Sequence, residues 1–183
     1  MKAVIIYESM FGNTRAVADA IAEGFRRGNE ATVVPVARAR PEVLDGADLV
    51  VVGGPTHAHG MTRAITRKGA TEMAAKPDSG LALEPGAPGP GLRDWFAHLG
   101  HFTVPAAAFD TRIDGLAVFT GQASRGIARL LRHHGFHLVA GPESFLISKG
   151  NRLRAGEEER AMEWGRLLSS KVIAMRLAAT DRA

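Results

Sequence analysis

The sequence predicts a doubly wound α/β protein, with a five-stranded parallel sheet and helices on both of its faces. Three observations predict this class. Uninterrupted apolar runs of strand length, at residues 3–7 and 49–53, are typical of strands buried on both faces of a parallel sheet. Segments with helical spacing of apolar residues alternate with such runs. Both runs end in loops of small and hydroxylated residues, and the carboxyl ends of parallel strands meet at one sheet edge.

Each element follows from its local pattern. The first strand leads into a helix over residues 15–25. Its inward stripe begins at Thr14, just before this range, and continues with Val17, Ala18, Ile21 and Phe25. Further strands are expected at residues 31–36, 48–53, 105–109 and, as one strand divided at Gly141-Pro142, 137–140 and 144–147. Further helices are expected at residues 41–44, 61–75, 92–99, 124–134 and 157–177. Residues 116–121 are expected to be a short strand or part of a loop.

Three local details accompany these elements. Pro35 indicates an edge strand or a strand end. Ser124 is the expected cap of its helix. The last helix is expected to bury a stripe made of Ala161, Trp164, Leu168, Val172 and Met175.

The chain is expected to form one domain over residues 1–183, since this length suits a single core. Residues 76–91 hold four prolines and several glycines, so they are predicted to be a loop insertion lying over the edge of the sheet.

Composition excludes several classes of function. No cysteine is present, so disulfides, thiol catalysis and thiolate metal sites are unavailable. No run approaches eighteen apolar residues, so no membrane span is expected. The amino terminus is predicted to be a strand and not a signal peptide, which makes the cytoplasm the expected location.

The net charge is +4, but no basic run is interleaved with aromatic residues, so a nucleic-acid groove is not expected. The helix at 124–134 is basic, which indicates either a solvated face or a docking patch for an acidic redox partner.

The loop Ser9-Met10-Phe11-Gly12-Asn13-Thr14 lies between the first strand and the first helix. Free backbone amides and the positive end of the helix dipole meet there, which makes it a site for an anion, most often a phosphate. No lysine follows Gly12 as in a nucleotide triphosphatase loop, and no second glycine makes a dinucleotide loop.

This loop resembles the phosphate loop of the flavodoxin family, which wraps the 5′-phosphate of FMN. Met10 and Phe11 occupy its two middle positions, and a methionine and an aromatic residue there resemble the branch of the family that contains flavin-dependent quinone reductases. The resemblance implies that Ser9, Met10, Phe11, Gly12, Asn13 and Thr14 bind FMN. A capped turn without a ligand is the alternative.

A second loop supports the same resemblance. Gly53-Gly54-Pro55-Thr56 resembles the Gly-x-Pro-Thr of the family, which implies FMN contacts from Pro55, Thr56, His57, Ala58, His59 and Gly60. His57 stands where the family commonly has Tyr or Trp, and imidazole offers less stacking area. Gly60 is expected to permit a backbone conformation with positive φ.

A third loop follows the fourth strand, and by position the resemblance implies contacts to the pyrimidine side of the flavin from Asp110, Thr111 and Arg112. A mononuclear metal site built from His57, His59 and Asp110 is the alternative use of these loops.

The resemblance therefore implies a flavodoxin-like redox protein that transfers electrons through bound FMN, and a redox protein as its partner. An NAD(P)H:quinone oxidoreductase, with NAD(P)H and a quinone as partners, is the first alternative. A flavin-free interaction module on the same fold is the second. A homo-oligomer is left open.

Overall fold

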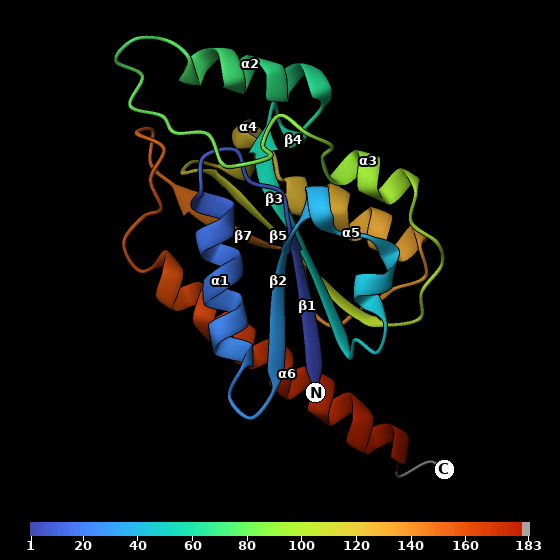
Figure 1. The fold of residues 1–183 in the computed structure, drawn as a ribbon. Coiled ribbons are helices and arrows are strands. Elements are labelled where there is room, and N and C mark those ends of the chain that lie inside the picture. Colours follow the sequence, from blue (N-terminus) through green and yellow to red (C-terminus); the bar gives the residue numbers. More distant parts are fainter. Residues whose placement is uncertain (181–183) are drawn as a thin grey trace.

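The computed structural model describes residues 1–180 and contains a twisted sheet with strand order β2-β1-β3-β5-β6 (Figure 1). The strands are β1 (Lys2–Tyr7), β2 (Glu30–Pro35), β3 (Leu49–His57), β4 (Gly60–Met61), β5 (Pro105–Ile113), β6 (His137–Leu138) and β7 (Glu143–Ile147). The α-helices are α1 (Asn13–Phe25), α2 (Ala64–Ala74), α3 (Leu92–Ala97), α4 (Ala117–Thr120), α5 (Ala123–His133) and α6 (Glu157–Thr180). Two short 3-10 helices, Val36–Arg38 and Pro41–Leu44, connect β2 to β3.

The main strands of the sheet run parallel, and β1 lies between β2 and β3. The order therefore reverses beside β1, so the crevice at the switch point opens between the carboxyl ends of β1 and β3. The predicted doubly wound sheet with helices on both faces is confirmed.

Alternate residues of each central strand enter two separate cores. On β1, Ile5 and Tyr7 pack toward α1 and α6, while Val4 and Ile6 pack toward α3 and α5. Because both sets are apolar, the strand shows no polar alternation in the sequence.

The helices α1 and α6 cover one face of the sheet, and they touch backbone to backbone (Figure 1). A Cβ built on Gly165 of α6 would lie 2.2 Å from the carbonyl oxygen of Ile21, and one on Gly24 of α1 would lie 1.9 Å from that of Met162. The two glycines therefore permit a helix spacing that no larger residue would allow.

The opposite face is covered by α3 and α5. Trp95 and Phe96 of α3 are buried there, with ring centroids 4.8 Å apart in an edge arrangement. This aromatic pair therefore belongs to the core.

The fifth strand of the sheet is divided in two, as Gly141-Pro142 predicts. Leu138 of β6 pairs with Ala106, whereas Glu143 of β7 pairs with Phe109. Five residue steps on this strand thus match three on β5, and the two additional residues bulge out around Gly141-Pro142.

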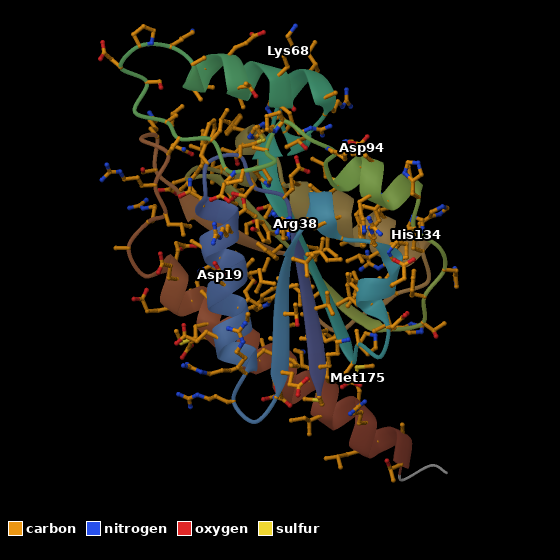
Figure 2. The ribbon with its side chains drawn as sticks, in the orientation of Figure 1. Asp19, Arg38, Lys68, Asp94, His134 and Met175 are labelled. Atoms are coloured by element: carbon orange, nitrogen blue, oxygen red, sulfur yellow. The ribbon has the colours of Figure 1, made fainter. Side chains whose placement is uncertain are left out.

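Three local predictions were wrong. Residues 116–121 contain a short helix, α4, and not a strand. Met175 is 46% exposed because α6 continues past the amino ends of the strands, as Figure 2 shows, and no sheet lies beneath it. Ser124 does not cap α5; the amides of Ala123 and Ser124 donate to Thr56 Oγ1 (2.9 Å) and Asp110 Oδ2 (2.7 Å) on the neighbouring strands.

Residues 76–91 form no helix or strand and run beside the first loop. The amide of Glu84 donates to the carbonyl of Met10 (2.9 Å), and Met10 packs with Ala70 and Ala87. The segment therefore covers the loop that follows β1. Within residues 1–180, no helix is both long and apolar enough to span a membrane.

Candidate functional site

The loop after β1 presents the first turn of α1 to the sheet edge. Gly12 adopts a left-handed conformation (φ 91°), and its amide donates to Ser9 Oγ (3.1 Å). The first hydrogen bond of the helix runs from the amide of Ala16 to the carbonyl of Gly12 (2.9 Å). The amides of residues 13–15 therefore have no acceptor within the helix, and they lie at its positive end.

The side chains of Asn13 and Thr14 are engaged with other segments. The amide group of Asn13 donates to the carbonyl and to Oδ1 of Asn151 (both 3.1 Å), and its Oδ1 accepts from the amide of Leu153 (3.1 Å). The hydroxyls of Thr14 and Thr111 share a hydrogen bond of 2.7 Å. Backbone amides are therefore the free donors of this loop, and the two side chains hold its neighbours in place.

The expected loop after the third strand is a β-hairpin. The strand β3 continues to His57, which pairs with Gly60 of the antiparallel β4. Ala58 (φ 45°) and His59 (φ 71°) form a two-residue turn with positive φ at both positions, a geometry that matches strand twist. Gly60 itself belongs to the strand that follows the turn and has no positive φ in this structure, so its expected freedom to adopt positive φ stays a prediction.

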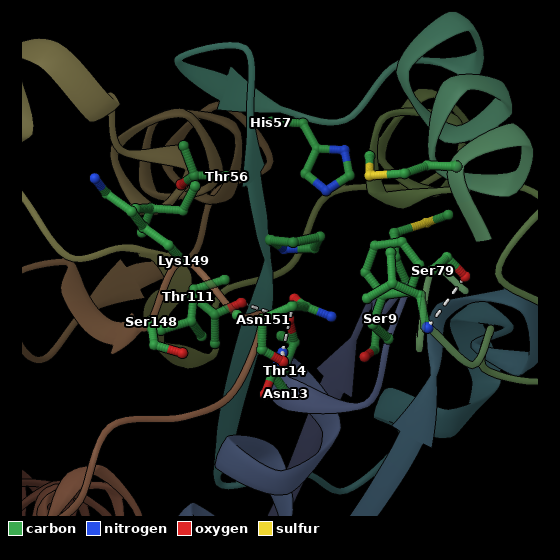
Figure 3. Close-up of a pocket in the computed structure, with 18 residues that line it drawn as sticks. Ser9, Asn13, Thr14, Thr56, His57, Ser79, Thr111, Ser148, Lys149 and Asn151 are labelled. Carbon is green, nitrogen blue, oxygen red and sulfur yellow. Dashed lines mark hydrogen bonds between the residues drawn. The ribbon is translucent and has the colours of Figure 1, made fainter. Parts of the chain in front are cut away.

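The ring of His57 faces the cavity from the end opposite Asn13 and Thr14 (Figure 3). Burial lowers the pKa of His57 below its usual value, and the negative charge of Glu8 only partly opposes this effect. The imidazole is therefore neutral at pH 7.

This lowered pKa of His57 has a measurable consequence for stability. Between its folded pKa and 6.5, the unfolded chain binds more protons than the native protein, so the free energy of unfolding should rise with pH. We expect the difference in the free energy of unfolding between pH 5 and pH 8, measured with urea, to be smaller for His57→Gln than for the native protein. His133→Gln, at an exposed position on α5, is the matched control and should retain the native difference.

The three residues expected in the third loop separate in the structure. Thr111 lines the cavity, whereas Asp110 is fully buried beneath α5, and burial raises the pKa of its carboxyl group despite the hydrogen bond from the Ser124 amide. The guanidinium of Arg112 donates to the carbonyl of Gly115 (2.7 Å) and to Thr120 Oγ1 (3.1 Å), so it fixes the segment that contains α4.

A cavity of about 360 Å³ opens where these loops meet, a volume within the usual range for small-molecule sites. It brings together nine of the predicted site residues: Ser9, Met10, Phe11, Asn13, Thr14, Pro55, Thr56, His57 and Thr111. The other six lie outside its lining: Gly12, Ala58, His59, Gly60, Asp110 and Arg112.

Two groups of lining residues were missed from the sequence. One is Met73, Ser79 and Leu81, from the end of α2 and the insertion; no local pattern marks them. The other follows β7 and consists of Ile147, Ser148, Lys149, Gly150 and Asn151, with Ile113 beside it. The polar turn in this second group follows a strand at the same sheet edge, and that position could have identified it.

The metal alternative has no support in the geometry. Within residues 1–180, no three His, Asp or Glu side chains gather closely enough to hold an ion. Asp110, one of the three ligands considered, lies in the core beneath α5.

Comparisons with known proteins agree with this architecture. The family model for flavodoxin matches residues 5–78, which contain the first two loops. No curated protein sequence matches the chain significantly.

Several solved structures share the fold. A flavodoxin from the domain Archaea is 20% identical, with a TM-score of 0.63 over 94% of this chain and 99% of that one. Oxidised flavodoxin 1 from Bacillus cereus is 19% identical, with a TM-score of 0.63 over 95% and 98% of the two chains. Rubredoxin oxygen:oxidoreductase from Desulfovibrio gigas is 19% identical, with a TM-score of 0.59 over 94% of this chain and 36% of that one. The chain therefore has the flavodoxin fold, and its residues 5–78 match the flavodoxin family model.

Proposed function

We propose that the chain binds FMN in the 360 Å³ cavity and carries electrons between redox partner proteins. The observation that carries this proposal is the position of the cavity, which joins the first turn of α1 to the carboxyl ends of β3 and β5. The similarity to flavodoxin structures supports the same assignment.

The donor set suits a flavin mononucleotide. The free amides at the start of α1 suit the phosphate dianion, because they lie at the positive end of the helix dipole. Met10, Phe11, Pro55 and Leu81 give the cavity apolar walls against which a flat ring can pack. When bound, the flavin supplies the redox chemistry, and the protein supplies binding, orientation and electrostatics.

The residues of the chain then have separate roles. The turn from Ser9 to Gly12 fixes the direction of the amides toward the phosphate. His57, neutral at pH 7, offers a ring face at the far end of the cavity, and neutral imidazole adds no charge beside the flavin. The segment over the first loop, residues 76–91, limits access of water to the phosphate end.

A titration of the purified protein with FMN and with riboflavin tests this proposal. Riboflavin lacks the phosphate, and hydrogen bonds to a charged group are each worth about 1.5–3 kcal/mol. We expect riboflavin to bind at least about tenfold more weakly than FMN, measured by quenching of flavin fluorescence. Equal affinities would contradict a phosphate site at the start of α1.

The carrier role needs a second measurement on the FMN-loaded protein. Under anaerobic conditions, NADPH alone should leave the absorbance of the bound flavin unchanged, while dithionite should bleach it. Rapid bleaching by NADPH would contradict the carrier role, because an electron carrier depends on a partner enzyme to receive its electrons.

A further inference from the structure

A tight turn after β7 brings a lysine to the cavity. The amide of Asn151 donates to the carbonyl of Ser148 (3.0 Å), which closes a four-residue turn with Lys149 at its second position. Lys149 lines the cavity, and Figure 3 shows it on the same side as Ser148 and Thr111, across from His57.

This turn is fixed to the first residue of α1. Asn13 donates twice to Asn151 (both 3.1 Å) and accepts from the amide of Leu153 (3.1 Å). The first and last Cα atoms of such a turn lie within about 7 Å of each other, so the backbone of Lys149 is held close to the free amides of the helix. Figure 3 shows the ammonium group of Lys149 pointing away from Asn13 and Thr14, and rotation of its flexible four-carbon stem would bring it to a ligand at the start of α1.

The charges around the cavity favour an anion beside this lysine. Of the described residues that line the cavity, Lys149 is the one lysine or arginine, and none is an aspartate or a glutamate. Glu84 comes close to the first loop, where its Oε1 would lie 3.4 Å from a Cβ built on Gly12. It is paired with Arg15 (3.6 Å) and lines a separate cavity of about 20 Å³, so its charge is partly compensated.

We propose that Lys149 binds the phosphate of FMN, an inference that rests on the proposed function. The amides at the start of α1 and the ammonium group of Lys149 hold the phosphate between them, and the Asn13–Asn151 contact sets the distance between these two groups. Selection of FMN over riboflavin thus depends on the turn after β7 as well as on the loop after β1. The lysine adds a charged, salt-sensitive contact to a set of neutral donors.

Affinities of Lys149→Gln for FMN and riboflavin test the assignment. Lys149 is exposed at a turn, so the variant should fold as the native protein does. We expect FMN to bind about tenfold more weakly or worse, and riboflavin to change by less than about twofold. Lys149→Arg should retain most of the FMN affinity, and Lys171→Gln, which removes the same charge from an exposed position on α6, should match the native protein.

The salt dependence gives a second readout on the same proteins. Between 20 and 300 mM NaCl the Debye length changes about fourfold. Over this interval, the FMN affinity of the native protein should fall more steeply than the FMN affinity of Lys149→Gln. Unchanged FMN affinity in Lys149→Gln, or an equal loss for FMN and riboflavin, would overturn the assignment while leaving the proposed function intact. Failure of the native protein to bind FMN would overturn both.

Discussion

Replacing Gly165 with alanine is expected to lower the free energy of unfolding by about 1–3 kcal/mol, the scale for forcing atoms into a packed core. The new Cβ would lie 2.2 Å from the carbonyl oxygen of Ile21, so α1 and α6 would have to separate. Alanine favours helix over glycine by about 1 kcal/mol, but that gain is smaller than the cost of separating the helices.

Urea unfolding of Gly165→Ala and Gly69→Ala measures this effect. Gly69 lies within α2, and a Cβ built on it meets no atom within 4 Å. Gly69→Ala should therefore stabilise the protein by about 0.5–1 kcal/mol through helix propensity alone. Native stability in Gly165→Ala would show that the two helices can move apart at little cost.

Removing the carboxylate of Glu8 is expected to lower the free energy of unfolding by about 2–5 kcal/mol. Glu8 is buried at the end of β1, where it accepts hydrogen bonds from the hydroxyl of Thr62 and from the amide of Leu92 (2.8 Å). Glu8→Ala would leave both buried donors without a partner, and each unsatisfied buried group costs about 1–3 kcal/mol. Arg67, also buried, would lose a nearby negative charge and retain its ion pair with Asp94 (3.0 Å) and its long hydrogen bond to Thr62 Oγ1 (3.5 Å).

Two further variants separate the loss of these buried hydrogen bonds from the general effect of replacing a glutamate. Glu8→Gln keeps one oxygen acceptor and should lose less stability than Glu8→Ala. Glu23→Ala, at an exposed position on α1, should stay within about 0.5 kcal/mol of the native protein. The prediction fails if urea unfolding gives the same free energy for Glu8→Ala and Glu23→Ala.

The sequence was sufficient to predict the doubly wound parallel sheet and the inward stripe of α1. Val17, Ala18, Ile21 and Phe25 are all buried, because their spacing records which side of the helix meets the sheet. The break of the fifth strand was predictable for a similar reason, since Gly141-Pro142 disrupts pairing through its own backbone chemistry.

What could not be predicted depends on contacts between distant segments. Thr56 lines the cavity and Asp110 lies outside its lining, yet both accept hydrogen bonds from the first amides of α5, which no pattern near either residue records. Likewise, the contact between Asn13 and Asn151 joins residues 138 positions apart. The turn after β7 could be expected at the same sheet edge, but the contact that joins it to α1 exists only in three dimensions.

The bulge at Gly141-Pro142 also affects how the sheet meets other chains. An uninterrupted outer strand offers a row of free amides and carbonyls to a neighbouring molecule. Here one outer strand is divided into β6 and β7, and the other, β2, ends in Pro35, which has no amide hydrogen to donate. Pairing between the sheets of two copies would therefore be interrupted at the bulge on one side and at Pro35 on the other, which disfavours that route to aggregation.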